Sequence, residues 1–193
     1  MAGIEEAETF AEEASIDVAK ATPKPLFELL VLSLLLASRI DHELSLRAFA
    51  SLRRAKLTSV DGLADAEPAD VVHALDGDYL RKERTTDLLQ TCARQVRDDW
   101  SGDLRKLREE AGGDVARATE LVEAFKGFGP VGAEIFLREV QVAWEDLSPF
   151  YGERVKEAAK ARHVPSSDAK LAELGDPARI GAALIRSTFS PTK

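Results

Sequence analysis

The chain has 193 residues, of which 45% are hydrophobic and 31% charged, and its formal net charge is −8. This composition is typical of a folded globular protein and excludes a disordered chain. The single cysteine, Cys92, excludes an internal disulfide and a four-cysteine zinc or iron–sulfur centre, so no metal or cofactor is expected. The negative net charge argues against a protein that coats nucleic acid without specificity.

The first 24 residues are acidic. Residues 1–23 hold six acids and one base, a charge of −5, which leaves −3 for the rest of the chain. They contain neither the basic start nor the apolar stretch of a signal peptide, so a cytoplasmic location is expected. The most apolar run, residues 25–38, is 14 residues long and includes Glu28. A membrane span needs roughly 20 apolar residues, so this run predicts a buried core helix and no membrane association.

Helical periodicity dominates the rest of the chain. Apolar residues recur at spacings of three and four, and no segment of any length alternates as a strand would. The sequence therefore predicts an all-α protein. After a helix that starts at Pro25, further helices are expected over residues 43–54, 68–75, 80–99, 103–111, 114–125, 130–142, 151–162 and 177–188.

Residues 122–137, VEAFKGFGPVGAEIFL, interrupt this pattern sharply. A helix is expected to end near Phe125, and a second is expected to begin at Pro130 after the turn KGFG. Gly127 and Gly129 are predicted at positions that allow positive φ, where they leave room for a phosphate beside the free amides of the second helix. A tight helical turn without a ligand is the alternative, because short glycine motifs match by chance.

The same stretch resembles the helix–hairpin–helix of the endonuclease III branch of base-excision DNA glycosylases, the HhH-GPD superfamily, whose pattern is L-x-x-L-P-G-V-G-x-K-T-A. Residues 25–49, PLFELLVLSLLLASRIDHELSLRAF, are similar to the family's first barrel helix and the turn after it. Residues 144–155, WEDLSPFYGERV, fall on the family's V-D-T-H-V-x-R-V segment. The resemblance covers Pro25 to Val155.

The resemblance implies a fold and a partner. A six-helix barrel would span residues 25–133, residues 134–193 would form a second helical lobe, and the acidic segment 1–24 would pack on that lobe. Double-stranded DNA, intact or damaged, would bind in the cleft between them, with the target base turned out of the stack. The protein is expected to act as a monomer.

Two departures from the family concern the chemistry. The lysine that forms a Schiff base in strand-cutting members is replaced by Val131, and the aspartate that supports base release is replaced by Pro149. No catalytic residue is therefore expected. A loop shift of three residues would bring Asp146 to the aspartate position, but Asp146 and the nearby Glu145 and Glu153 fit equally a capping or solvated role at the helix from 151.

The family's gap-filling glutamine is replaced by Arg39, which either fills the gap beside an extruded base or is a solvated arginine. Three aromatic residues, Trp144, Phe150 and Tyr151, either line a stacking pocket or belong to the core. The residues expected to contact DNA are Lys126, Gly127, Phe128, Gly129, Val131, Gly132, Arg39, Arg53 and Arg54.

Three functions are consistent with these features. The first is a DNA-binding protein that recognises duplex structure or damage without the family's usual glycosylase and lyase chemistry. The second is an active but atypical DNA glycosylase. The third is a helical protein-interaction module, which the acidic balance favours.

Overall fold

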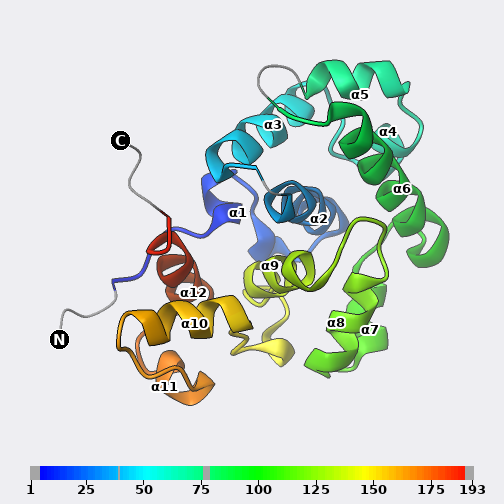
Figure 1. The fold of residues 1–193 in the computed structure, drawn as a ribbon. Coiled ribbons are helices and arrows are strands. Elements are labelled where there is room, and N and C mark those ends of the chain that lie inside the picture. Colours follow the sequence, from blue (N-terminus) through cyan, green and yellow to red (C-terminus); the bar gives the residue numbers. More distant parts are fainter. Residues whose placement is uncertain (1–4, 39, 76–78, 190–193) are drawn as a thin grey trace.

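The computed structural model describes residues 5–38, 40–75 and 79–189, and within these ranges it contains helices and no strand (Figure 1). The all-α prediction is confirmed. The α-helices are α1 (Phe10–Glu13), α2 (Pro23–Ala37), α3 (His42–Arg54), α4 (Val60–Ala64), α5 (Pro68–Ala74), α6 (Lys82–Trp100), α7 (Arg105–Ala111), α8 (Val115–Glu123), α9 (Pro130–Val140), α10 (Glu153–Ala161), α11 (Asp168–Ala172) and α12 (Pro177–Arg186), and two 3₁₀ turns are η1 (Val18–Lys20) and η2 (Glu145–Leu147).

Most helix positions agree with the sequence prediction. The first long helix begins at Pro23 rather than at Pro25, because both prolines fit within the first turn, where a missing amide costs nothing. Three helices escaped prediction, α1, α4 and α11, because four or five residues are too few to establish a periodicity. The sequence also predicts N-caps at Asp103, Asp114 and Asp176. The side chains of Asp114 and Asp176 accept backbone hydrogen bonds from the first turns of α8 and α12, as predicted, whereas the N-cap of α7 is Leu104, so the prediction is wrong at Asp103.

Helix α2 lies at the centre of the molecule, with α3, α6 and α9 packed around it (Figure 1). Apolar residues surround its axis because neighbours cover every side, and the residues from Pro25 to Leu35 are all buried. Two of these residues are polar, Glu28 and Ser33, and Glu28 accepts hydrogen bonds from Arg53 Nη2 and Thr58 Oγ1, both at 3.1 Å. The predicted buried core helix is therefore confirmed, and its one acid is paired as burial demands.

The acidic N-terminal segment is held by specific contacts rather than by charge alone. The amide of Ala11 donates to Glu139 Oε2 of α9 at 2.9 Å, and Glu13 pairs with Arg186 of α12 at 2.6 Å. Arg53 of α3 also donates to the carbonyl of Ala14 at 2.7 Å. The segment thus joins the C-terminal helices to the helices around α2. No helix in the described ranges is long and apolar enough to cross a membrane.

Candidate nucleic-acid interface

The turn between α8 and α9 forms a hairpin, here defined as residues 126–129. Gly127 has φ +93°, and a Cβ there would also press on Leu88 at 3.1 Å, so glycine is required for two reasons. Gly129 has φ −136° and ψ −169°, an extended conformation open to any residue, so of the two glycines predicted at positions that allow positive φ, only Gly127 adopts it. The reason is that Gly129 is the N-cap of α9, and N-cap residues are extended.

Several amides of the hairpin and of the start of α9 have no acceptor among the described residues. Those of Gly127, Gly129 and Val131 are free, whereas Phe128 donates to the carbonyl of Phe125 at 3.0 Å. Pro130 at the first helical position has no amide to offer. The start of α9 therefore presents unpaired N–H groups and the partial positive charge of a helix N-terminus, the combination that binds an anion such as phosphate.

Helix α6 fixes the geometry of the hairpin through one side chain that sequence analysis missed. Gln95 Oε1 accepts a hydrogen bond from the Lys126 amide at 2.7 Å, and Gln95 Nε2 donates to the carbonyl of Ala124 at 3.2 Å. The Lys126 side chain stays exposed. A glutamine that holds a backbone segment through both halves of its amide leaves no signal in the sequence, because its partner lies 31 residues away.

Two of the predicted contact residues face inward. Phe128 is 9% exposed and packs edge-on against Phe125, with ring centroids 6.1 Å apart. Gly132 lies against Phe128 and Ala37, where a Cβ would approach Phe128 Cδ1 to 2.9 Å. Both residues therefore seat the hairpin on α2, and their side-chain positions are unavailable to a ligand.

A pocket of about 630 Å³, the central pocket, opens beside the start of α9. Its walls come from α1, the turn between α2 and α3, α9, α10 and α12. Val131 stands on its rim and is 41% exposed. The apolar part of the wall includes Phe10, Ile40, Val131, Ile135, Ile185 and Phe189.

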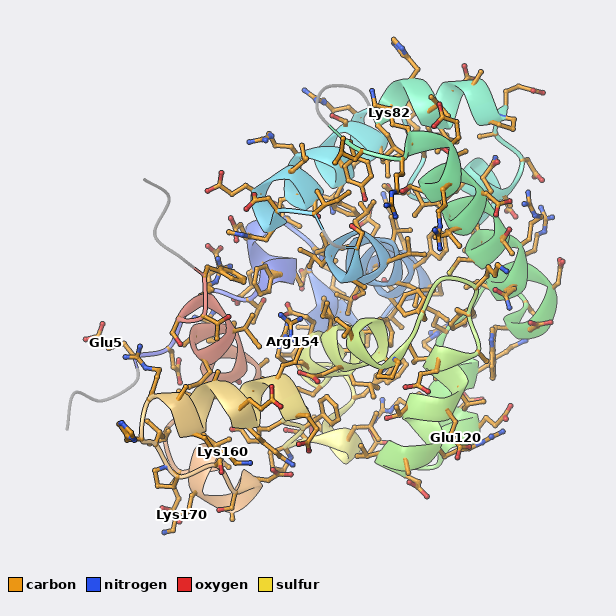
Figure 2. The ribbon with its side chains drawn as sticks, viewed as in Figure 1. Glu5, Lys82, Glu120, Arg154, Lys160 and Lys170 are labelled. Atoms are coloured by element: carbon orange, nitrogen blue, oxygen red, sulfur yellow. The ribbon has the colours of Figure 1, made fainter. Side chains whose placement is uncertain are left out.

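The charged residues around the central pocket come mainly from α9 and α10. Arg138 and Arg154 line it, and Figure 2 shows Arg154 at the start of α10 beside α9, whereas Lys160 lies on the side of α10 that faces α11 and Lys170 lies at the lower edge of the view. Arg138 is 1% exposed and donates through Nε and Nη2 to Glu139 Oε1, at 3.3 and 3.2 Å. The pocket therefore has a buried guanidinium in its wall.

Glu134 lies between these two arginines but acts as a helix cap. Its Oε2 accepts a hydrogen bond from the Arg154 amide at 3.4 Å in the first turn of α10, where the N-cap, Gly152, has no side chain to offer. The Glu134 side chain fills the space that a Cβ on Gly152 would need. Burial raises the pKa of Glu134 above its ordinary value, and the nearby amide and arginines offset only part of that shift.

A second pocket, the lateral pocket, has a volume of about 460 Å³ and lies on the other side of the turn after α2. It shares Ala37, Ser38 and Ile40 with the central pocket, and it is bordered by Gly127 and by the start of α6. At this start lie three residues that sequence analysis did not single out: Leu80, which is 67% exposed, Arg81 and Arg84. The run LRKER, residues 80–84, was the available signal.

The predicted basic residues of α3 lie elsewhere. Arg53 is committed to Glu28 and to the carbonyl of Ala14, and its guanidinium covers the ring of Phe49. Arg54 is exposed and bonds Ser51 Oγ at 2.8 Å. Helix α2 separates α3 from α9 (Figure 1), so these arginines are not brought to the hairpin. Arg39 lies outside the described residues.

Asp146, the acid considered as a catalytic surrogate, is paired with an arginine away from the central pocket. Asp146 in η2 forms an ion pair with Arg108 of α7 at 2.7 Å and lines a separate small pocket with Arg105 and Arg108. It does not line the central pocket, and this placement gives the surrogate role no support. Glu145 and Glu153 are exposed, as a solvated role requires.

The segment around Pro149 is anchored from α9. Gln141 accepts a hydrogen bond from the Phe150 amide at 2.9 Å and donates to the Phe150 carbonyl at 3.1 Å. Pro149 follows a cis peptide bond and is exposed. Trp144 and Tyr151 are 0% and 2% exposed, so these two aromatic residues belong to the core rather than to a stacking surface.

A comparison with protein-family models finds no match to the chain, and a comparison with curated protein sequences finds no significantly similar protein.

Proposed function

We propose that the chain is a double-stranded-DNA-binding protein of the helix–hairpin–helix glycosylase type, which recognises duplex structure or damage without the family's usual chemistry. One observation carries the proposal. The free amides of the hairpin stand directly beside a pocket large enough for an extruded base, and the residue on the rim between them is Val131.

Backbone phosphate is the DNA group that suits the hairpin. Free amides at a helix start bind phosphate through hydrogen bonds and the helix dipole, and they do so without reading the sequence. Lys126 is exposed next to these amides, and Arg81 and Arg84 lie beside Gly127 across the lateral pocket. The exposed Leu80 offers an apolar side chain that suits contact with an opened base step.

The same surroundings favour binding over catalysis. Val131 has no amine for a Schiff base, and Pro149 has no charge to support base release. Base release develops positive charge on the sugar, which the guanidinium groups of Arg138 and Arg154 would oppose. Excision of uracil, oxidised pyrimidines and alkylated bases is therefore expected to be absent or very weak in single-turnover assays.

The binding half of the proposal is tested by titrating a labelled duplex at several salt concentrations. Lys126→Gln should reduce the slope of log affinity against log salt by about one unit, because one phosphate contact is lost. Lys160→Gln is the matched control, since this lysine is exposed on α10 near α11 rather than at the hairpin, and it should leave the slope unchanged (Figure 2). Equal salt-dependence slopes for the two variants would show that the hairpin is not part of the DNA interface.

The resemblance itself is tested by restoring the missing amine. Val131→Lys should form a borohydride-trapped complex with an abasic duplex, because the side chain starts at the pocket rim. Val142→Lys is the control two residues past the end of α9, at a position that is 38% exposed and does not line the central pocket. The parent protein should trap nothing. Trapping by the parent would refute the loss of lyase chemistry.

The alternative of an active, atypical glycosylase has one observation in its favour. Among the described residues that line the central pocket, Asp41 contributes a carboxylate, although its Oδ1 accepts amide hydrogen bonds from Glu43 and Leu44. Rapid release of any lesion by the parent, abolished in Asp41→Asn and retained in Asp146→Asn, would establish this alternative.

A further inference from the structure

The central pocket contains hydrogen-bond donors that no described residue uses. Arg138 donates hydrogen bonds from Nε and Nη2 to Glu139, and its Nη1 has no hydrogen-bond partner in the described ranges. The guanidinium of Arg154, which also lines the pocket, makes no hydrogen bond or ion pair there. Guanidinium groups keep their charge at any physiological pH, so the unused donors are cationic ones.

The carboxylates around the pocket are engaged at helix starts. Such an acid is already compensated by amides and by the dipole of the helix it caps. Asp41 accepts from the amides of Glu43 and Leu44 at the start of α3, Glu134 accepts from the Arg154 amide at the start of α10, and Glu139 accepts from the Ala11 amide in α1. Glu134 does not line the pocket, although its buried Oε1 has no partner among the described residues. Among the residues that line the pocket, the unused groups are therefore Nη1 of Arg138 and the guanidinium of Arg154.

The walls suit a flat ring. The rings of His42 and Phe189 are stacked with centroids 4.3 Å apart, and both line the pocket. Val131, Ile135 and Ile185 add aliphatic surface. Apolar and aromatic walls with a few convergent polar groups are typical of sites for small planar ligands.

We infer that the central pocket takes a planar heterocycle that carries a carboxylate, with Arg154 and Arg138 as the groups that bind the carboxylate. Arginine and a carboxylate match in geometry and form two parallel charge-assisted hydrogen bonds. A neutral ring would leave the buried guanidinium of Arg138 without an acceptor for Nη1, whereas a carboxylate would supply one, and this difference makes the pocket selective. The ring is either an extruded base in a duplex, in which case the inference rests on the proposed function, or a free molecule.

The experiment compares charged and neutral ligands from both sources. Duplexes with one 5-carboxycytosine or one 5-methylcytosine at the same position are titrated by fluorescence anisotropy, and free orotate and uracil are titrated by NMR. The 5-carboxycytosine duplex is expected to bind about tenfold more tightly, and orotate but not uracil should shift resonances of the pocket. Arg154→Gln should reduce the tenfold preference to near one. Arg162→Gln, at an exposed arginine just past α10, should preserve it.

The outcomes separate this inference from the proposed function. Equal, salt-dependent binding of both duplexes without any orotate binding overturns the inference and leaves duplex binding intact. A preference that persists unchanged in Arg154→Gln overturns it as well. Orotate binding without any duplex binding supports a carboxylate pocket for a free ring and refutes the proposed function.

Discussion

At the scale of single residues, the positions that tolerate substitution least are those with a positive φ or with a buried charge. Gly127 combines a positive φ with contact to Leu88, whereas two residues later Gly129 is extended with no heavy atom near its missing Cβ. The adjacent residues Arg138 and Glu139 form an ion pair in which both side chains are almost fully buried. Identical substitutions at neighbouring positions should therefore have very different effects.

Gly127→Ala is expected to lower the free energy of unfolding by about 1–3 kcal/mol, since alanine is strained at φ +93° and meets Leu88. Gly129→Ala should lower it by less than about 1 kcal/mol, because the conformation and the space around Gly129 suit a side chain and only the poorer N-capping by alanine is lost. Urea unfolding measures both. If Gly129→Val keeps its stability but loses duplex affinity, the free space at Gly129 serves a ligand; unchanged affinity would make the hairpin purely structural.

Arg138→Met should destabilise the protein by about 3–5 kcal/mol, because Glu139 would be left as an unpaired buried charge. The double variant Arg138→Met with Glu139→Gln should recover most of this loss, since the amide oxygen still accepts from the Ala11 amide. Chemical denaturation of the two variants and of Glu139→Gln completes the cycle. A double variant as unstable as the single one would show that packing of Arg138, rather than charge, dominates.

At the scale of elements, α9 is the organising helix. It begins at the hairpin, packs on α2, lines the central pocket, caps α10 through Glu134 and bonds the start of α1 through Glu139. Gln141, just past its end, holds the segment around Phe150. One helix thus determines how the hairpin, the pocket and the C-terminal helices are placed relative to each other.

The cap between α9 and α10 predicts a pH dependence. The pKa of Glu134 is raised by burial above its ordinary value of 4.5, so above about pH 4.5 the folded state binds more protons than the unfolded state. The free energy of unfolding should therefore fall as the pH rises from 4.5 through the raised pKa. Subtracting the stability of Glu134→Gln from that of the parent at each pH isolates this contribution, and the difference should decrease with pH.

Glu12 provides a control, because its pKa is shifted in the opposite direction to that of Glu134. Burial alone would raise its pKa, but hydrogen bonds from Thr9 and the ion pair with Arg179 outweigh that effect and lower the pKa below 4.5. The stability of the parent relative to Glu12→Gln should therefore increase as the pH rises towards 4.5. If the stability difference between the parent and the glutamine variant changed with pH in the same direction for Glu134 and Glu12, the pKa shifts assigned to these two residues would be contradicted.

At the scale of the whole molecule, the hydrophobic core is continuous. One cluster of buried side chains runs from Phe10 through α2 and α6 to Trp144 and Ile185. The barrel expected over residues 25–133 and the lobe expected over residues 134–193 thus share a core, and the N-terminal segment contributes Phe10 to it. A shared core couples regions that are distant in sequence into one folding unit.

The two tryptophans test this coupling, because Trp100 ends α6 and Trp144 lies beyond α9. In Trp100→Phe and Trp144→Phe, the remaining tryptophan reports on one region at a time. Fluorescence and far-UV circular dichroism should give one coincident urea midpoint within each variant. In the Trp100→Phe variant, a fluorescence midpoint of Trp144 well below the circular dichroism midpoint would show that the C-terminal lobe unfolds on its own.

The sequence by itself determined the features that depend on local interactions. The all-α class follows from apolar spacing along the chain, the hairpin follows from Gly127, Gly129 and Pro130, and the caps of α8 and α12 follow from aspartates next to the helices they cap. Each depends on residues a few positions apart, whose geometry the backbone dictates. The similarity to base-excision glycosylases and the DNA-binding role come from the same local patterns and stay predictions.

Only the tertiary structure decided which charged side chains are available to a ligand. Arg53 was expected at the DNA and is instead bound to Glu28, while Arg81 and Arg84 lie beside the hairpin without having been expected there. Asp146 is paired with Arg108, 38 residues away in the chain. Every arginine looks alike in a sequence, because what distinguishes a free guanidinium from a committed one is a partner brought close by folding.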